Sequence, residues 1–407
     1  MKLTQAISRA NYRFFLLHAV FLALAKNFMD VDTIIPAMMI DSGGKSIHVG
    51  LLTAILVGGT KFAQLFFASM INNKTSKKGY LLLGINLRIF SLAGLAVLFF
   101  YSSMLTGGMI IGMIFLLITI FSVSGAFANI SFTDILGKSV LQQSRKSFFS
   151  IRQVISSIGM FLSAFLAGKV LVSNDYPDNY AYLFLIAALA LGIASVGFWN
   201  IQEIRSEQTF RIIGIKRYFQ VIRQEIKSNK KFSNYLMLIN TQGIVMALMP
   251  FLILFAKDHY EATSQAVRTF LIFKVTGGVI IGSLLFYYAR KVKYQNLLYM
   301  TSLLALLIPL YIYLVPVSDV FFLAFLGGGI VYTLHKVSID GVLLEVSSNE
   351  NRALYTGLSG AGSILPSVFP LLGGWIIDQF GYATFFSLFA GIIMISLYFV
   401  YKLNCQK

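Results

Sequence analysis

Long apolar stretches alternate with short polar connections along the whole sequence. An α-helix needs about 20 consecutive apolar residues to cross the hydrocarbon core of a bilayer. Twelve stretches reach that length, at residues 13–40, 49–71, 80–101, 107–136, 148–172, 181–201, 233–256, 265–289, 296–315, 320–344, 353–377 and 383–402. Short connections make consecutive helices antiparallel. The pattern therefore predicts an all-α integral membrane protein with twelve transmembrane helices.

The composition supports this interpretation. The chain has 407 residues, of which 57% are hydrophobic and only 12% are charged, and its mean hydropathy is +0.76. Soluble proteins are about 25% charged, so this chain has too few charges to cover a water-facing surface of its size. The bias extends over the full length, which argues against a single membrane anchor on a soluble domain.

The basic residues predict how the chain is oriented. With the N-terminus inside, the inner segments contain 23 Lys and Arg residues and the outer segments contain 4. Positive residues accumulate on the cytoplasmic side of membrane proteins. Both termini are therefore predicted to be cytoplasmic. The net charge of +17 follows mostly from this topology and does not indicate nucleic-acid binding.

A long basic stretch after the sixth span divides the chain. Its apolar residues recur at helical spacing, at Ile212, Ile215, Phe219 and Ile222. Such a pattern is typical of an amphipathic helix that lies on the inner membrane surface. We therefore expect a six-helix bundle at 1–201, a cytoplasmic linker at 202–232 and a second six-helix bundle at 233–407.

The two halves share short matching segments in the same order. GGTKFAQLFFASMINNK in the second span corresponds to GGVIIGSLLFYYARKVK in the eighth. The first and seventh spans each carry an asparagine followed by a proline, at Asn27 and Pro36 and at Asn240 and Pro250. The fourth and tenth spans each end in an aspartate followed by an arginine, at Asp134 and Arg145 and at Asp340 and Arg352. The shared order predicts duplicated, pseudo-symmetric halves, which is one of the transporter architectures.

Two sets of six spans, cytoplasmic termini, a basic central segment and paired Asp…Arg junctions together resemble the major facilitator superfamily. That family often carries a Gly-x-Leu-x-Asp-Arg-x-Gly-Arg-Lys-like stretch after the second span, where this chain reads INNKTSKKG (71–79). The basic cluster and Gly79 remain, but the aspartate and the first glycine are absent. The resemblance implies a monomeric transporter in a bacterial inner membrane. Its halves would rock around a substrate site at the bilayer midplane.

Motifs for enzymatic or ATP-driven chemistry are absent. GGKS (43–46) has the tail of a phosphate loop, but Met39 stands where that motif needs its first glycine. The four histidines lack metal-ligand spacing, and no G-x-S-x-G, H-E-x-x-H or CxxC pattern occurs. We expect no enzymatic activity, no cofactor and no bound metal.

Several charges fall inside predicted spans, where each costs at least about 2.5–3.5 kcal/mol. Lys26 and Asp30 are four residues apart, as are Lys336 and Asp340, so each pair would share one helix face. Asp134 lies near the start of the next span, within predicted reach of Arg145 and Arg152. These junction charges, together with Asp340 and Arg352, either neutralise one another and join helices or act in gating.

Four charges remain without a predicted partner, namely Asp32, Lys61, Arg88 and Lys274. Lys61 and Lys274 lie near mid-membrane in corresponding spans, and Arg88 is close enough to the inner end to extend toward it. Buried unpaired lysines are tolerable when they face an aqueous cavity. We predict that both lysines bind the anionic part of a substrate, with further polar contacts from Asn27, Asn240, Gln242 and Lys336. The structural alternative is that the lysines meet Asp32 or carbonyl groups across helices.

The sequence thus predicts a secondary active transporter for a small organic solute, with an anion as the first hypothesis. A desolvated carboxylate that pairs with lysine in only one state changes its affinity for a proton. Asp30 or Asp32, with Lys26, is therefore a candidate for proton coupling. Efflux of amphiphilic or drug-like compounds is the alternative within this class, and a membrane receptor or scaffold is the alternative outside it.

The predicted topology can be tested with single cysteines. Ser42→Cys and Asn174→Cys should react with an impermeant maleimide in intact cells, because both positions are predicted to lie outside. Ser76→Cys and Ser144→Cys should react only after the membrane is breached. The reverse labelling pattern would exclude the twelve-span arrangement.

Overall fold

A computed structural model describes residues 3–72, 74–204, 220, 223–224, 227, 229–288, 292–314, 318–346, 358–360 and 362–403. The elements in these ranges are helices, most of them long and apolar. Contacts between them divide the chain into two compact units. Unit 1 comprises Met1–Asp30 and Gly59–Ile215, and unit 2 comprises Val31–Gly58 and Lys216–Lys407.

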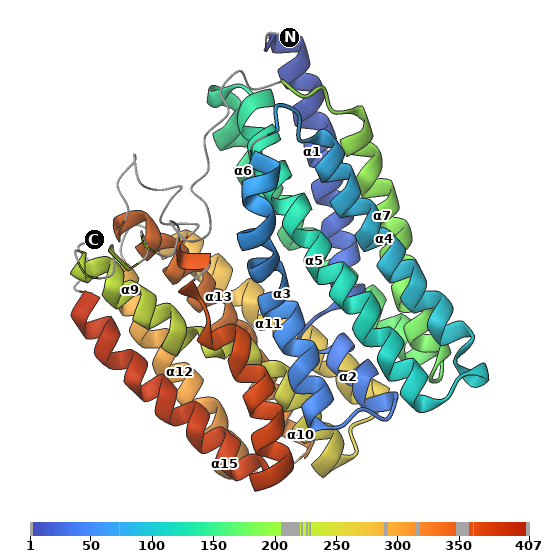
Figure 1. Ribbon diagram of the computed structural model, residues 1–407. Coiled ribbons are helices and arrows are strands. Elements are labelled where there is room, and N and C mark those ends of the chain that lie inside the picture. Colours follow the sequence, from blue (N-terminus) through green and yellow to red (C-terminus); the bar gives the residue numbers. More distant parts are fainter. Residues whose placement is uncertain are drawn as a thin grey trace. The chain divides into compact units, whose positions relative to one another are not determined.

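Unit 1 is a bundle of antiparallel helices. They are α1 (Gln5–Lys26), the 3₁₀ helix η1 (Asn27–Met29), the larger part of α3 (Ser46–Asn72), α4 (Lys78–Phe100), η2 (Ser102–Met104), α5 (Gly107–Ser139), α6 (Gln142–Ser173) and α7 (Asp178–Asn200). α4 packs against both α5 and α7, and α1 packs against α6 and α7 (Figure 1). The bundle thereby brings side chains from α1, α4, α5 and α6 together in its interior.

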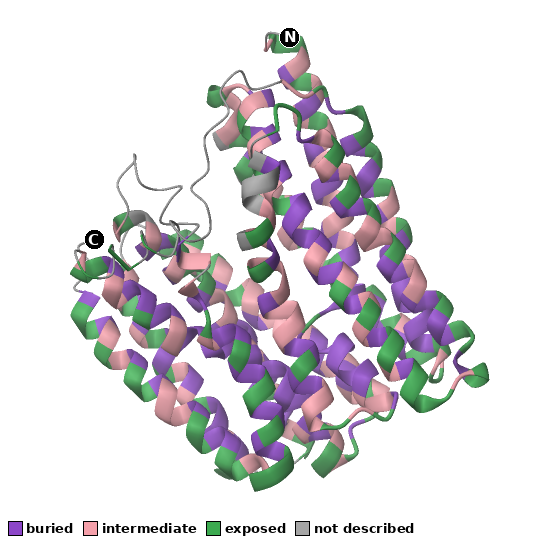
Figure 2. Ribbon diagram, in the orientation of Figure 1, coloured by how far each residue is buried: buried purple, intermediate pink, exposed green. Residues whose placement is uncertain are grey.

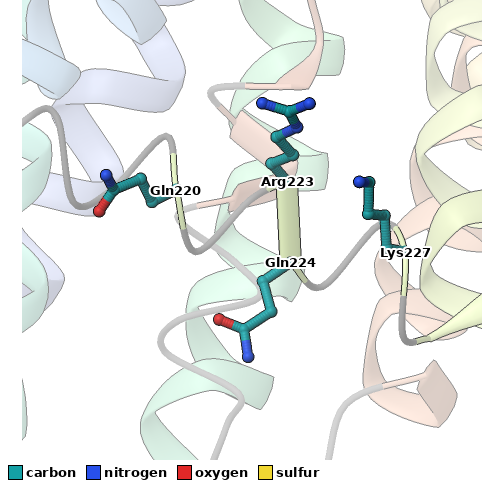
Figure 3. Close-up of a pocket in the computed structure, with 4 residues that line it drawn as sticks. All are labelled: Gln220, Arg223, Gln224 and Lys227. Atoms are coloured by element: carbon teal, nitrogen blue, oxygen red, sulfur yellow. The ribbon is translucent and has the colours of Figure 1, made fainter.

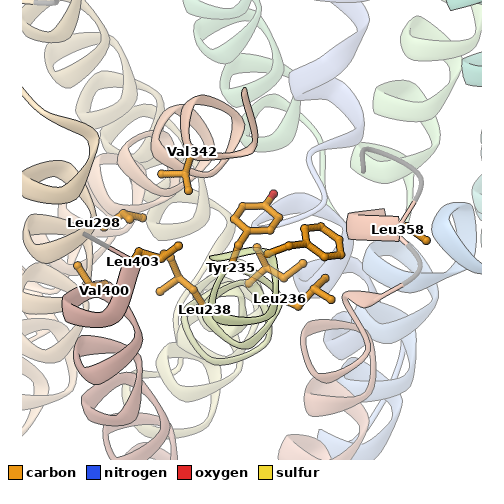
Figure 4. Close-up of a cluster of buried hydrophobic side chains, with 10 residues drawn as sticks. Tyr235, Leu236, Leu238, Leu298, Val342, Leu358, Val400 and Leu403 are labelled. Carbon is orange, nitrogen blue, oxygen red and sulfur yellow. The ribbon is translucent and has the colours of Figure 1, made fainter. Parts of the chain in front are cut away.

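Unit 2 contains the helices of the second half and one segment of the first. They are α2 (Ile34–Asp41), the start of α3, α9 (Lys230–Thr241), η3 (Gln242–Ala247), α10 (Leu248–Tyr260), α11 (Ser264–Tyr288), α12 (Tyr294–Leu314), η4 (Ser318–Val320), α13 (Phe322–Val346) and α15 (Leu365–Leu403). One core cluster joins α9, α12, α13 and α15 around Tyr235, Leu298, Val342 and Val400 (Figure 4).

The predicted division of the chain at residues 201 and 233 rests on the sequence duplication and stays a prediction. The contacts group the chain differently, because residues 31–58 pack with helices of the second half. The chain therefore leaves unit 1 after Asp30 and returns to it at Gly59, inside α3.

The described helices agree with the predicted spans. Eleven of them are long and apolar enough to cross a membrane. The last, at Leu358–Leu403, has 46 residues and covers the two spans expected at 353–377 and 383–402. Gly381, with φ of +78°, interrupts the helical conformation between those two spans. A side chain would be strained at that φ, so glycine marks the turn.

The first and seventh spans, predicted at 13–40 and 233–256, each contain a break inside one candidate membrane span. The first span ends as α1 at Lys26, passes through η1 and a non-helical stretch at 30–33, and resumes as α2. The seventh span is interrupted at the corresponding place by η3, between α9 and α10. Apolar length alone cannot reveal such breaks. Matched breaks in the first spans of both halves agree with a duplicated, pseudo-symmetric architecture.

Large apolar side chains are exposed along the outer faces of the helices, as the green segments in Figure 2 illustrate. Among them are Phe66, Phe90, Leu116, Trp199 and Phe286. Such residues are stable on a helix surface when lipid, not water, surrounds it. The exposed faces therefore match an integral membrane protein.

Close packing of α11 on α13 depends on Gly277. A Cβ atom at this position would collide with the carbonyl oxygen of Leu326 on α13. Gly277→Val should therefore lower the free energy of unfolding by about 1–3 kcal/mol, the usual cost of overpacking. Thermal unfolding in detergent measures the effect.

Gly282→Val is the matched control, because it lies on the same helix and a Cβ there meets no described atom within 4 Å. The change in helix propensity is the same in both variants. Equal losses of stability would mean that propensity, not the contact with Leu326, accounts for the effect.

Candidate functional site

A buried ion pair joins Asp32 to Lys274. The Lys274 Nζ lies 2.5 Å from Asp32 Oδ2, and the two side chains are only 12% and 7% exposed. Asp32 belongs to the non-helical stretch before α2, and Lys274 lies ten residues into α11, both in unit 2. The pair is the structural alternative for Lys274, in which the lysine meets Asp32 across helices and does not stay unpaired. Removing one member would take this partner from the other buried charge, and breaking a buried ion pair in this way costs about 3–5 kcal/mol.

Packing of α13 fixes the position of Lys274. The backbone of Gly329 lies so close to the Lys274 carbonyl that a Cβ could not fit between them. The backbone at Lys274 is thereby held against a rigid helix. A lysine held in this way, beside a carboxylate from a broken helix, forms a charge pair of defined geometry.

A second ion pair, also within unit 2, ties α2 to α10. The Lys257 Nζ lies 2.6 Å from Asp41 Oδ1, with side chains 12% and 21% exposed. Asp41 ends α2, and Lys257 is in the last turn of α10. Sequence reasoning missed this pair because it treated both residues as parts of solvated loops. The two ion pairs hold both ends of the segment 32–41 on helices of the second half.

Amide side chains beside the helix breaks form hydrogen bonds to the backbone of neighbouring helices. Asn27 Nδ2 donates to the Met160 carbonyl oxygen at 2.5 Å and to Ser163 Oγ at 2.9 Å, both on α6. Asn240 Nδ2 donates to the Gly362 carbonyl oxygen at 2.7 Å, and its Oδ1 accepts from the Leu365 N–H at 2.9 Å. The asparagines therefore tie the first span to the fifth and the seventh span to the eleventh, which are equivalent contacts in the two halves.

Gln242 begins the break in the seventh span and is fully buried. Its Nε2 donates to the Leu298 carbonyl oxygen at 2.9 Å and to Ser302 Oγ at 2.7 Å. Its Oε1 lies 3.1 Å from His335 Nδ1 on α13. These bonds use both amide hydrogens and the oxygen. Substrate binding by Asn27, Asn240 and Gln242 stays a prediction, because in this structure their amides join helices.

Lys26 and Asp30 do not lie on one continuous helix. Lys26 is the last residue of α1, and its Nζ lies 3.5 Å from the Met160 sulfur. Asp30 is buried and has extended backbone angles of −64° and 122°. The helical geometry assumed for this pair is therefore wrong. A role for either residue in proton coupling remains a prediction.

The other lysines predicted to bind substrate lie on intact helices. Lys61 is half-buried on α3. Lys336 is exposed on α13, as is Asp340 one turn further on. Within the described ranges no ion pair joins Lys336 to Asp340. Substrate binding by Lys61 and Lys336, and gating by Asp340, stay predictions.

The junction after α5 is built differently from the prediction. Asp134 pairs with Lys77 at 3.0 Å and Lys138 at 2.5 Å. Arg145 instead donates to the carbonyl oxygens of Val140 and Gly137, near the C-terminal end of α5. The expected pairing of Asp134 with Arg145 or Arg152 is therefore wrong. Arg352 of the corresponding junction lies outside the described residues.

Glu203 completes this junction, and sequence reasoning missed it. Its carboxylate accepts hydrogen bonds from the Lys77 and Lys78 N–H groups at 2.6 and 3.0 Å and from Ser76 Oγ at 2.6 Å. A carboxylate at these positions caps the free N–H groups at the start of α4 and favours its dipole. In this chain Glu203 and Asp134 supply carboxylates beside the INNKTSKKG segment, which itself has none.

Four polar residues of the central linker line a shallow pocket in Figure 3, namely Gln220, Arg223, Gln224 and Lys227. All four are helical and exposed. Their spacing of three, one and three residues is that of one face of a helix, as expected for the polar side of an amphipathic helix. In Figure 3 the side chains of Arg223 and Gln224 point in opposite directions. The apolar positions from Ile212 to Ile222 lie outside the described residues.

Comparisons with known proteins establish the family. A model of the Major Facilitator Superfamily matches residues 16–339, so the chain belongs to this family. No curated protein matched the sequence. The fold is that of a transporter in this superfamily, as the sequence predicted.

Solved structures share the fold over nearly the whole chain. A D-xylose–proton symporter is similar with a TM-score of 0.71 and 12% identity, covering 96% of this chain and 97% of that one. A POT family transporter in complex with a thioalcohol-conjugated peptide has a TM-score of 0.70 and 12% identity, with 96% of each chain covered. The nucleoside transporter NupG has a TM-score of 0.66 and 13% identity, covering 98% of this chain and 100% of that one.

The role of Gln242 in joining helices can be tested by Gln242→Leu. The change removes the amide's bonds to the Leu298 carbonyl oxygen, Ser302 and His335, and each lost hydrogen bond costs about 0.5–1.5 kcal/mol. Thermal stability in detergent should fall by several degrees or more, and the affinities for charged and neutral ligands should decrease alike. Gln265→Leu, on the exposed start of α11, is the control. A Gln242→Leu protein of unchanged stability that loses one ligand selectively would instead support direct substrate contact.

Proposed function

We propose that this protein is a proton-coupled secondary transporter of a small organic anion, working by alternating access. Membership of the Major Facilitator Superfamily supports transport. The buried Asp32–Lys274 ion pair supports the coupling step. A bacterial inner membrane and a monomeric state are parts of the same proposal.

The ion pair links proton binding to anion binding through charge balance. While Asp32 is ionised, it neutralises Lys274. Protonation of Asp32 removes that compensation and leaves a buried positive charge, which is strongly unfavourable. An anionic group of the substrate then restores neutrality at Lys274. A proton and a negatively charged group therefore bind together, and their release restores the original pair.

The positions of the two residues favour this role over a purely structural one. Asp32 lies in a helix break, where the backbone is not fixed by helical hydrogen bonds, and Lys274 lies on an intact helix. Transporter sites for substrates and coupling ions are often formed at interrupted helices. A carboxylate that moves against a fixed lysine can switch between two partners.

Coupling is tested with Asp32→Asn, which mimics the protonated carboxylate. A thermal-shift screen of organic acids, D-xylose, uridine and a dipeptide first identifies a ligand, because binding raises stability. In proteoliposomes with an imposed pH gradient, wild-type protein should accumulate that ligand against its gradient. Asp32→Asn should lose accumulation but keep exchange, since an amide cannot cycle a proton.

Asp41→Asn is the matched control, because it breaks the other ion pair of the same segment and should leave proton-driven accumulation in place. Asp30→Asn, measured in parallel, tests the second carboxylate. Undiminished accumulation in both Asp32→Asn and Asp30→Asn would mean that neither carboxylate carries the proton. A ligand set made up of neutral amphiphiles would favour the efflux alternative.

A further inference from the structure

Arg88 extends into the interior of unit 1 and does not turn toward the membrane surface. It lies ten residues into α4, about 15 Å along the helix and hence near the middle of a bilayer. Its guanidinium lies 4.2 Å from the centre of the Phe121 ring on α5. A Cβ at Gly125 would lie 3.8 Å from Arg88 Cζ and 3.0 Å from Thr60 Oγ1. The glycine thus leaves room for the guanidinium beside α3 and α5.

A second arginine reaches the same interior from α6. Arg152 also lies ten residues into its helix. Since α4 and α6 are the third and fifth spans of an antiparallel bundle, they run in the same direction, and each arginine lies in the half of its helix that follows the predicted cytoplasmic end. The Arg152 guanidinium lies 5.2 Å from the centre of the Phe132 ring, which is on the same helix as Phe121.

His18 of α1 lies within electrostatic range of both guanidinium groups. Its ring stacks on Phe198 with 3.9 Å between centroids and lies 6.1 Å from Phe132. The side chain is 7% exposed, and its Nδ1 is buried without a hydrogen-bond partner among the described residues. Arg88 Nε is also buried without a hydrogen-bond partner among the described residues. Buried polar atoms are normally satisfied, so the Arg88 Nε–H points to a ligand that accepts a hydrogen bond. The other ring nitrogen of His18 bonds to the Ala194 backbone, so Nδ1 presents an acceptor lone pair.

The positive charge in this region has no described counterion. Neither Arg88 nor Arg152 forms an ion pair or a hydrogen bond with any residue in the described ranges. Asp134 is already paired with Lys77 and Lys138. Two unpaired arginines inside a membrane bundle are costly, and aromatic faces offset only a small part of that cost.

We propose that Arg88, together with Arg152, forms an anion-binding site inside unit 1, with the His18 ring packed beside it. The identity of the physiological ligand rests on the proposed function, the transport of an anion. The site narrows the class of that anion to carboxylate or phosphate compounds. The planar guanidinium presents paired N–H donors that match the oxygens of such groups. Phe121 and Phe132 hold the arginine heads and exclude water around them.

The site is tested by ligand-induced stabilisation of the purified full-length protein at constant ionic strength. The probes are inorganic phosphate and succinate, with neutral succinamide as the ligand control. At least one anion should stabilise the wild-type protein, and succinamide should not. Because Arg88→Met removes a charge-assisted hydrogen bond, it should raise the Kd for the anion about 10- to 150-fold. The Kd of Arg88→Lys should lie between those of the wild type and Arg88→Met, because lysine keeps the charge but loses the paired donors.

Two further variants make the result specific. Arg13→Gln removes an exposed arginine from α1 and should leave anion affinity unchanged. Arg152→Gln should also weaken anion binding. The double variant with Arg88→Met should lose less binding free energy than the two single variants lose together, because both residues serve one ligand. If Arg88→Met fails to fold, Arg88→Lys and Arg152→Gln carry the test.

The proposal is overturned if neither anion stabilises the wild-type protein, or if Arg88→Met and Arg152→Gln bind the anion as tightly as the wild type does. Lys274→Gln separates this inference from the proposed function. It should abolish coupled transport while leaving binding at Arg88 in place. Loss of anion binding in Lys274→Gln alone, with both arginine variants unaffected, would place the anion at Lys274 and overturn the site in unit 1.

Discussion

The bilayer gives no hydrogen bonds to a backbone that leaves the helical conformation, and this constraint shapes both breaks in the molecule. At 27–33 and 242–247 the chain must satisfy its polar groups from neighbouring helices. In addition, the side-chain amides of Asn27, Asn240 and Gln242 tie the chain at the breaks to α6, the start of α15 and α12. The breaks are therefore stable features, and they determine where α2 begins and where Asp32 lies.

Hydrophobic length and charge asymmetry were enough to predict the helical membrane fold, because both are local properties of the sequence. The duplication was also visible, since Asn27 and Asn240 occupy equivalent places and make equivalent bonds. The positions of the breaks were not visible. The stretch from Phe28 to Ile40 is as apolar as the helices around it, apart from its two aspartates and one threonine. The two aspartates were the available signal, because a charge inside a span is costly.

Ion-pair partners could not be predicted in the same way, because they depend on packing between distant segments. Helical spacing suggested Lys26 with Asp30 and proximity in sequence suggested Asp134 with Arg145, whereas Asp134 pairs with Lys77 across helices. Lys274 and Asp32 were both recognised as buried and costly, but no sequence rule connects them. For Arg88, distance from the span end suggested extension toward the membrane surface. The space at Gly125 and the ring of Phe121 decide its actual direction.

The two units balance their buried charge in different ways, although they derive from one architecture. In unit 2 the mid-membrane lysine has a carboxylate partner from the broken first span, so the ligand-free state is already neutral at that point. In unit 1 the arginines of α4 and α6 rest on aromatic rings with no described carboxylate beside them. A neutral pair is suited to exchanging a proton, because protonation changes its net charge. An uncompensated cationic site is suited to attracting an anion, because binding reduces its net charge. Duplication followed by divergence of these few side chains would thus give each half its own contact with an anion, coupled to a proton only in unit 2.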